Sequence, residues 1–318
     1  MLYHAFHKLP IMRPWIQCTK RSIAAVSQEK TRNNLNVIDF FHPSLSSVLY
    51  RYSLRLGVSG YPKRGKPIES QDEGVYTSSQ VGDDAYFKRH DALGVADGVG
   101  GWRTHAGANP ALYSRKLMHY AQLELDRIKT NVRPQQSPVN PDPIQILESA
   151  YHLTTIDAQN ESIKGIVGST TACIAVLCQD ELRIANIGDC GISVIRKNNY
   201  IFRSEEQQHS FNFPFQLGTA SFDSPSDAQQ FTVKIEENDI IVLGSDGLFD
   251  NLYDDEILEE VKKLIDQTDL DPMTIPQLIS EALVQRAKIG GKADDISVIV
   301  AIIKKDDQLP EPSPPPLP

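Results

Sequence analysis

The sequence predicts an α+β fold in which helices cover antiparallel sheets, and three observations lead to this prediction. Short strand candidates rich in Val and Ile come in clusters instead of alternating regularly with helices, which disfavours a doubly wound parallel sheet. Four longer stretches have apolar residues at helical spacing. The 318 residues, 40% of them hydrophobic, suffice for one large domain or two small ones with a proper core.

The predicted elements follow one another from residue 50 to residue 303. Between residues 50 and 58, Tyr, Leu and Val alternate with Arg, Ser and Gly, which is typical of a half-buried strand that opens the folded domain. Pro143, followed by apolar residues at helical spacing, marks the start of a helix. Asp83 and Asp84 precede a further short strand. The other strands are expected at 92–96, 170–178, 182–187, 192–196, 231–235, 240–244 and 296–303, and the helices at 110–129, 143–159, 254–267 and 275–288.

The two ends of the chain differ from the rest in composition. The first 28 residues contain no Asp or Glu but several Lys and Arg, which is typical of an organelle transit peptide; a merely disordered tail is the alternative. We therefore expect a mitochondrial targeting leader and linker at 1–47, cleaved between Arg21 and Tyr50. The folded domain is expected at 48–304, followed by a Pro-rich, disordered tail at 305–318.

Composition also narrows the class of protein. The net charge of −9 argues against a nucleic-acid partner, because phosphate backbones require clustered Lys and Arg. No apolar stretch approaches the ~20 residues that a membrane span requires. The four Cys lack the spacing of a zinc site or of a redox pair, so a reducing compartment fits and a disulfide framework does not.

Carboxylates flank the apolar strand candidates at five places. Asp97, Asp189 and Asp246 follow apolar runs, Asp294 and Asp295 precede one, and Asp83 and Asp84 precede the short strand. One Asp-Gly pair is most simply a turn. Five such places at one end of a sheet would repel one another, and a bound divalent cation would offset this repulsion. Oxygen ligands without His or Cys clusters favour Mg²⁺ or Mn²⁺. Two cations about 3.5–4 Å apart can lower the pKa of a bridging water and clamp a phosphate, so the residue types suggest phosphoester hydrolysis.

The order of six motifs resembles the protein phosphatase 2C family of metal-dependent PPM phosphatases, over about residues 50 to 304. DGVGGW and the stretch at 203–217 are most similar to the mitochondrial branch of that family. The resemblance implies a four-layer α-β-β-α sandwich, two antiparallel sheets flanked by helices, with two Mn²⁺ or Mg²⁺ ions at one end. The motifs are GDD (82–84), GVADGVGGW (94–102), GSTTAC (168–173), ANIGDCG (185–191), GSDGLFDN (244–251) and GGKADDISV (290–298).

The resemblance also implies roles for single residues. Asp97 would bridge both metals, Gly98 would lend its carbonyl oxygen to one, and Asp246 and Asp294 would complete the ligands of the other. These three Asp are the expected catalytic residues. Water activated between the metals would attack phosphorus directly. The remaining implied positions are Asp83, holding a metal through water; Asp84, behind the ligands; Asp189, at a third, weaker metal; and Asp295, a structural neighbour.

The sequence departs from the family pattern at two positions near the site. Val99 stands where many members have a His proposed to protonate the leaving oxygen, and Ser79 stands where the family has a phosphate-anchoring Arg. Arg103 and Lys88 are the candidates to replace that Arg. His209 matches a loop His near the family's active site, and a local hydrogen bond in an exposed loop is the alternative interpretation.

Three functions remain open at this point. The leading prediction is a protein serine/threonine phosphatase; the alternatives are a pseudophosphatase that binds phosphoproteins and a hydrolase of small phosphometabolites. Phosphoproteins are the expected partners, and the resemblance points to mitochondrial matrix proteins, including enzymes of coenzyme Q biosynthesis. We expect a monomer without a nucleic-acid partner or a transmembrane segment.

Overall fold

The computed structural model describes residues 52–63, 76–130, 140–160, 166–267 and 271–305. The expected leader at 1–47 lies outside the described residues, and so does the expected tail apart from Lys305, which ends a strand. No helix in these ranges is long and apolar enough to span a bilayer.

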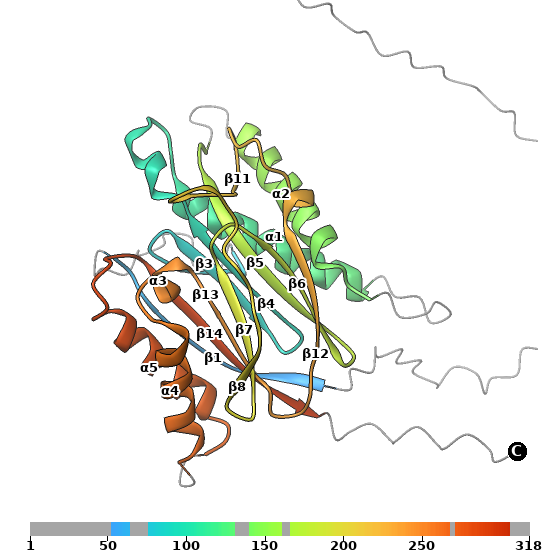
Figure 1. Ribbon diagram of the computed structural model, residues 1–318. Helices are drawn as coiled ribbons and strands as arrows, with labels where there is room; N and C mark the ends of the chain where they lie inside the picture. The colour runs from blue at the N-terminus through green and yellow to red at the C-terminus, as the bar shows by residue number, and fades with distance from the viewer. Residues whose placement is uncertain (1–51, 64–75, 131–139, 161–165, 268–270, 306–318) are drawn as a thin grey trace, which may run out of the picture. The chain divides into compact units, whose positions relative to one another are not determined.

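The first of two large antiparallel sheets contains both the first and the last strand of the described chain. Its strands are β1 (Tyr52–Tyr61), β7 (Gly191–Arg196), β8 (Asn199–Arg203), β13 (Ile240–Gly244) and β14 (Ile296–Lys305). They follow one another across the sheet as β1-β14-β13-β7-β8, so the long central strand β14 pairs with β1 and with β13 (Figure 1). All five residues of β13 and the first eight of β14 are buried, as two-sided coverage requires.

The second sheet is built around β5, whose ten residues are all buried. Its order is β12-β6-β5-β4-β3-β2, with the short strand β11 paired to β5, and a separate hairpin joins β9 to β10. The bounds are β2 (Ser79–Val81), β3 (Asp84–Arg89), β4 (Ala92–Gly98), β5 (Ser169–Cys178), β6 (Glu181–Ile187), β9 (Gln208–Ser210), β10 (Phe213–Pro214), β11 (Leu217–Gly218) and β12 (Gln229–Lys234).

The main helices cover the outer faces of the two sheets. Pro lies in the first turn of three of them, where its missing N–H and fixed φ suit a helix start. Helices α1 and α2 contact the second sheet, and α4 and α5 lie on the first sheet (Figure 1). The bounds are α1 (Pro110–Thr130), α2 (Pro143–Asn160), α3 (Asp246–Phe249), α4 (Asp254–Ile265) and α5 (Ile275–Ala287), with 3-10 turns at Gly100–Thr104 and Pro225–Asp227.

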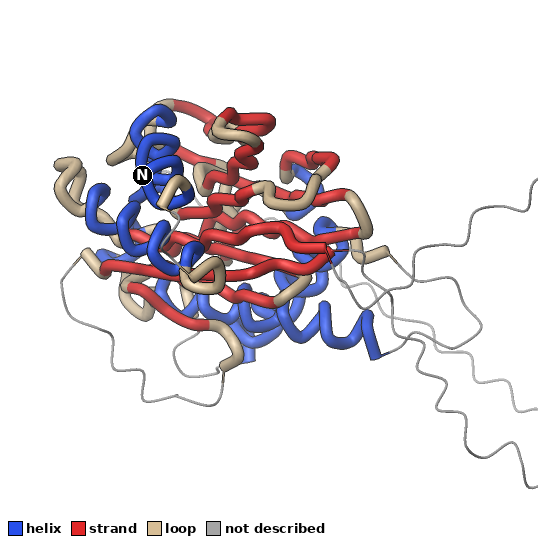
Figure 2. The backbone as a smooth tube through the Cα atoms, turned by 90° about the horizontal axis from the view of Figure 1, so that it is seen from below, coloured by secondary structure: helices blue, strands red, loops and turns tan. Residues whose placement is uncertain are grey.

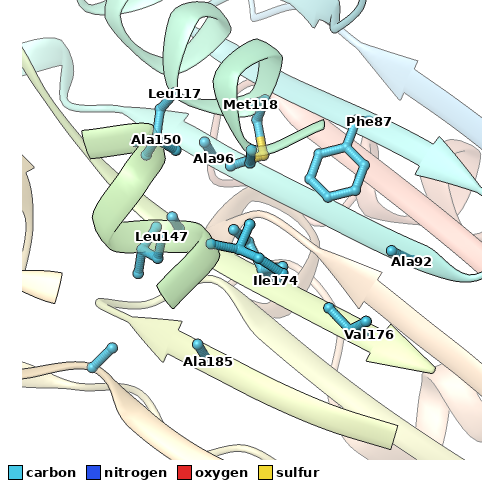
Figure 3. Packing of buried hydrophobic residues seen from close by; sticks show 14 of the residues in the cluster. Phe87, Ala92, Ala96, Leu117, Met118, Leu147, Ala150, Ile174, Val176 and Ala185 are labelled. Atoms are coloured by element: carbon cyan, nitrogen blue, oxygen red, sulfur yellow. The ribbon is translucent and has the colours of Figure 1, made fainter. Parts of the chain in front are cut away.

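Three layers of apolar side chains hold the four structural layers together. One layer lies between α1, α2 and the second sheet; Leu117 and Met118 of α1 face Ile174 of β5 there (Figure 3). A second layer lies between the two sheets, and a third between the first sheet and the helices α3 to α5. Figure 2 shows the same arrangement, with strands between helices. The predicted α-β-β-α sandwich of two antiparallel sheets is therefore confirmed.

The predicted elements agree closely with the observed ones, with a few differences. The strand predicted at 92–96 continues through Asp97 to Gly98, because both residues keep their pairing with β5. The strands β2, β8, β9, β10 and β11 and the single-turn helix α3 were not expected. The missed strands are short or lie at sheet edges, where burial on one face is incomplete and the alternating pattern is weak.

Candidate functional site

Carboxylates from both sheets converge at one end of the sandwich. Asp97, near the end of β4, lies directly opposite Asp84 of β3 in the antiparallel register. In the other sheet, β13 pairs with both β7 and β14, so the segments before β7, after β13 and before β14 meet at one edge. These segments carry Asp189, Asp246 and Asp294. The structure thus brings together residues that are far apart in the sequence.

Hydrogen bonds join the two sheets beneath this cluster. Ser245 Oγ donates to Asp84 Oδ2 at 2.7 Å, across the interface between the sheets. Asp295 Oδ2 accepts the backbone N–H of Asp83 at 2.8 Å, and its Oδ1 accepts the N–H of Lys63 at 2.6 Å. Asp295 therefore binds backbone N–H groups, which fits a structural role. Asp84 is bonded to Ser245 of the other sheet.

The cluster carries more negative charge than its own residues offset. Burial raises the pKa of Asp97, and the charges of Asp246 and Asp84 raise it further. Burial and the charge of Asp294 raise the pKa of Asp246. Burial, followed by the charge of Asp246, raises the pKa of Asp189 to about 7. Among the described residues, no donor reaches the buried atoms Asp84 Oδ1 and Asp246 Oδ1. Buried oxygens without a partner are costly, so these two oxygens are open to a cation or to water.

Two basic side chains each pair with a predicted metal-ligating carboxylate. Arg103 Nε donates to Asp83 Oδ2 at 2.9 Å, and a second guanidinium nitrogen bonds Oδ1. Lys63 Nζ lies 3.3 Å from Asp294 Oδ1. Arg103, predicted as a replacement for the phosphate-anchoring Arg, is therefore at the site but engaged with Asp83; its contact with substrate stays a prediction.

Lys292 forms a third and more central set of ion pairs. Its Nζ lies 2.9 Å from Asp246 Oδ2 and 3.6 Å from Asp294 Oδ2, and it also bonds Asp250. Its backbone is held by Asn251, whose amide group accepts the N–H of Lys292 and donates to its carbonyl oxygen. Burial lowers the pKa of Lys292, but the hydrogen bonds to Asp250 and Asp246 outweigh this and raise it.

The glycines after Asp97 serve different purposes. A Cβ on Gly98 would lie 2.6 Å from the carbonyl oxygen of Pro110 and 2.7 Å from that of Asp83, so this position must be glycine for β4 to meet the start of α1. No atom of another segment lies within 4 Å of a Cβ built on Gly101. Gly101 therefore leaves open space beside the carboxylates, whereas Gly98 is required by backbone packing.

The residues beyond the glycines hold the rim of the site in place. Trp102 Nε1 donates to Ser169 Oγ at 2.6 Å, which fits a packing anchor. His209 Nε2 lies 2.9 Å from Asp223 Oδ1, and its ring stacks on Phe215 with centroids 3.7 Å apart. His209 thus has the local hydrogen bond that was its alternative interpretation, and its contact with substrate stays a prediction.

The donor chemistry fits a hard divalent cation. The candidate ligands are carboxylate and carbonyl oxygens, and two of the buried carboxylate oxygens accept no hydrogen bond from the described residues. The charges of neighbouring carboxylates raise the pKa of both Asp97 and Asp246. Within the described residues, no three His, Cys, Asp or Glu side chains are arranged so that they could hold a metal ion by themselves. Mg²⁺ does not require one, because it keeps several waters and binds through one or two carboxylates.

Comparisons with known proteins agree with this geometry. The family model described as Stage II sporulation protein E (SpoIIE) matches residues 105–304. "Protein phosphatase PTC7 homolog" of Xenopus laevis is 38% identical over 255 residues, which cover 70% of this chain and 81% of that protein. "Probable protein phosphatase 2C 80" of Arabidopsis thaliana is 37% identical over 244 residues, covering 70% of this chain. The chain belongs to the protein phosphatase 2C family.

Solved structures show the same protein phosphatase 2C fold. The photosystem II phosphatase PBCP has a TM-score of 0.59 and 31% identity, with 79% of this chain and 99% of that chain covered. The catalytic domain of the serine/threonine phosphatase PstP, solved in complex with two manganese ions, has a TM-score of 0.54 at 18% identity, which shows the fold alone. The chain spans about half the length of its Arabidopsis relatives, 54% of one and 48% of another.

Several residues of this protein phosphatase 2C site were not assigned from the sequence. Lys292 and Asp250 lie inside quoted motifs, but nothing in their spacing shows that they meet. Lys63 has no sequence signal, because its partner lies 231 residues away. Ser245 directly precedes Asp246, and only the pairing of β13 with β14 shows that its hydroxyl faces Asp84.

Lys292→Gln is expected to tighten Mn²⁺ binding about fivefold and to lower the melting temperature of the metal-free protein. A partly exposed ion pair of this kind contributes about 1 kcal/mol, and the ammonium competes with a metal for Asp246 and Asp294. Isothermal titration of Mn²⁺ measures the first effect and thermal unfolding in EDTA the second. The matched control is Lys263→Gln, an exposed lysine on α4. Weaker Mn²⁺ binding in Lys292→Gln would show that Lys292 assists metal binding instead.

Proposed function

We propose that this chain is a metal-dependent protein serine/threonine phosphatase. The observation that carries the proposal is the convergence of Asp97, Asp189, Asp246 and Asp294 at one end of a protein phosphatase 2C sandwich. A buried oxygen of Asp246 there has no donor among the described residues. A cluster of this charge favours cations and the phosphate groups that cations bind.

The proposed ligands are the residues expected from the sequence. Asp97 and the carbonyl of Gly98 would serve one metal, Asp97, Asp246 and Asp294 the other, and Asp83 would act through water; Asp189 would serve a third, weaker ion. Mn²⁺ or Mg²⁺ held there supplies an acidified water and neutralises phosphate charge.

The chain's own side chains then orient the substrate and its protons. Asp97 and Asp246 are deprotonated when they hold a cation, and Arg103 is placed to contact phosphate if it leaves Asp83. Val99 has no acidic proton, so residue 99 cannot protonate the leaving oxygen. We therefore expect faster turnover of substrates with better leaving groups, since a positioned general acid contributes about 10²–10⁴-fold.

The test is phosphate release from a phosphothreonine peptide by the full chain, with Mn²⁺, with Mg²⁺ and with EDTA. Turnover that requires the metal supports the proposal. Turnover of a phosphosugar but not of the peptide would favour a small-molecule phosphomonoesterase. Binding of the peptide without turnover under either metal would favour a pseudophosphatase.

We also propose that the protein acts in the mitochondrial matrix, on matrix proteins that include enzymes of coenzyme Q biosynthesis. The support is the acid-free, basic composition of the first 28 residues together with the family resemblance. Sequencing the N-terminus of the mature protein is expected to place it between Arg21 and Tyr50. A mature protein that still begins at Met1 would contradict import with cleavage.

A further inference from the structure

The segment between β8 and β12 exposes an unusual amount of aromatic surface. Phe211 and Phe222 are 98% and 90% exposed, and Phe213 is 43% exposed. We call these three residues the phenylalanine surface. Phe211 lies in the turn of the β9–β10 hairpin, and Phe213 begins β10. Grouped exposed aromatic side chains are more often interaction sites than single exposed residues are.

His209 and Asp223 join the phenylalanine surface into one unit. The His209 ring contacts Phe213, with centroids 5.3 Å apart, and its Nε2 lies 2.9 Å from Asp223 Oδ1. Asp223 is buried and directly follows Phe222. Its Oδ2 also accepts the N–H of Gln216 at 2.9 Å. The hydrogen bonds of Asp223 with His209 and Gln216 therefore hold the loop in the conformation that exposes these rings.

Further hydrogen bonds attach this loop to the candidate site. The N–H of Gln207 donates to the carbonyl oxygen of Gly188, the residue before Asp189, at 2.8 Å. Ser169 Oγ donates to Gln216 Oε1 at 2.5 Å and accepts from Trp102, at the end of the glycine loop. The hairpin that carries Phe211 and Phe213 is thus connected on both sides to residues that border the carboxylates.

We propose that Phe211, Phe213 and Phe222 form a docking surface for an apolar side chain of a protein substrate, a few residues from its phosphoserine or phosphothreonine. The inference rests on the proposed function and adds a substrate preference to it. A polypeptide whose phosphate lies at the carboxylates has to pass the surrounding loops, and this is a loop with exposed aromatic rings. Each such ring can bury about 150–250 Å² against a partner.

The charges around the surface favour this occupant over a lipid bilayer. The exposed residues Glu205, Glu206 and Asp227 lie in the same loop, and the chain as a whole carries a net charge of −9. Anionic membrane surfaces attract basic segments and repel acidic ones. An apolar residue in a peptide has no such conflict.

The experiment uses eight phosphothreonine peptides in an Ala and Ser background. Each carries one Leu, at one of the four positions before or the four positions after the phosphoresidue, and all are compared with the peptide that has no Leu. The full chain is assayed with Mn²⁺ as wild type and as the double variant Phe211→Ser/Phe222→Ser. We expect at least one Leu position to raise kcat/KM about tenfold in the wild type, through KM, and the double variant to lose this preference.

The matched control is Leu153→Ser, which removes a 38%-exposed apolar side chain from α2 and should keep the preference. No Leu preference in an active wild type, or a preference that survives in the double variant, overturns the inference. A wild type that hydrolyses none of the peptides overturns the proposed function instead. Sedimentation tests the alternative that a second copy of this chain occupies the surface. A wild type that is a dimer, with a monomeric double variant that keeps the Leu preference, would assign the surface to that second copy.

Discussion

Asp246→Asn is expected to lower metal-dependent kcat/KM on a phosphothreonine peptide by at least about 10³-fold, which corresponds to about 4 kcal/mol of transition-state stabilisation. The change keeps the shape of the side chain and removes its charge. Asp246 raises the pKa of both Asp97 and Asp189, so it lies at the electrostatic centre of the cluster. Its Oδ1 accepts no hydrogen bond from the described residues and is open to a cation, whereas an amide nitrogen in its place cannot ligate one.

A measurement of metal affinity shows whether the lost activity comes from weaker metal binding or from slower turnover at a site that still binds metal. Mn²⁺ is expected to stabilise the wild type against thermal unfolding much more than it stabilises Asp246→Asn. The matched control is Asp266→Asn, the same change at an exposed residue that ends α4, which should match the wild type in both assays. Full activity of Asp246→Asn at saturating Mn²⁺ would remove Asp246 from the ligand set and would contradict the site proposed here.

The positions of the carboxylates could be predicted from the sequence because each adjoins an apolar run. Such runs are local signals: residues 240–244 form a strand with the predicted bounds, and Asp246 follows it. The register that sets Asp84 opposite Asp97 then follows from a tight connection between adjacent strands. The α+β class and the places of the carboxylates are therefore the parts that short-range patterns determine, whereas the order of the layers and the roles of the ligands came from the family resemblance.

The contacts that complete the site could not be predicted, because they join distant segments. The N–H of Asp83 reaches Asp295 across 212 positions in the sequence, and Lys63 meets Asp294 across 231. The local sequence predicts an exposed side chain for Lys292, which follows two glycines. Only the structure shows that it forms ion pairs with Asp246 and Asp250, at the start and just past the end of α3. The family resemblance did not help here, because these basic residues are not part of the ligand pattern that it supplies.

Asp189→Asn is expected to stabilise the metal-free protein at pH 8 and to leave its stability unchanged near pH 4. Burial and the charge of Asp246 raise the pKa of Asp189 from 3.8 to about 7 in the folded state. Since the folded pKa lies above the unfolded one, the contribution of Asp189 to stability is fully present below about pH 4. It is lost as the pH rises through 7. Each pKa unit is worth about 1.4 kcal/mol, so the roughly three units limit the effect to about 4 kcal/mol.

Urea unfolding in EDTA at pH 4, 6 and 8 measures this difference between Asp189→Asn and the wild type. Comparing the two proteins at each pH removes the contributions of carboxylates elsewhere whose pKa is lowered, such as Asp91, which change stability in the opposite sense. Asp266→Asn should follow the wild type throughout. Mn²⁺ should reverse the order at pH 8, because a bound cation stabilises the charged carboxylate that Asn lacks. A variant less stable than the wild type at every pH would show that Asp189 is held in its ionised form by the fold itself, and the carboxylate end would then not require a cation to balance it.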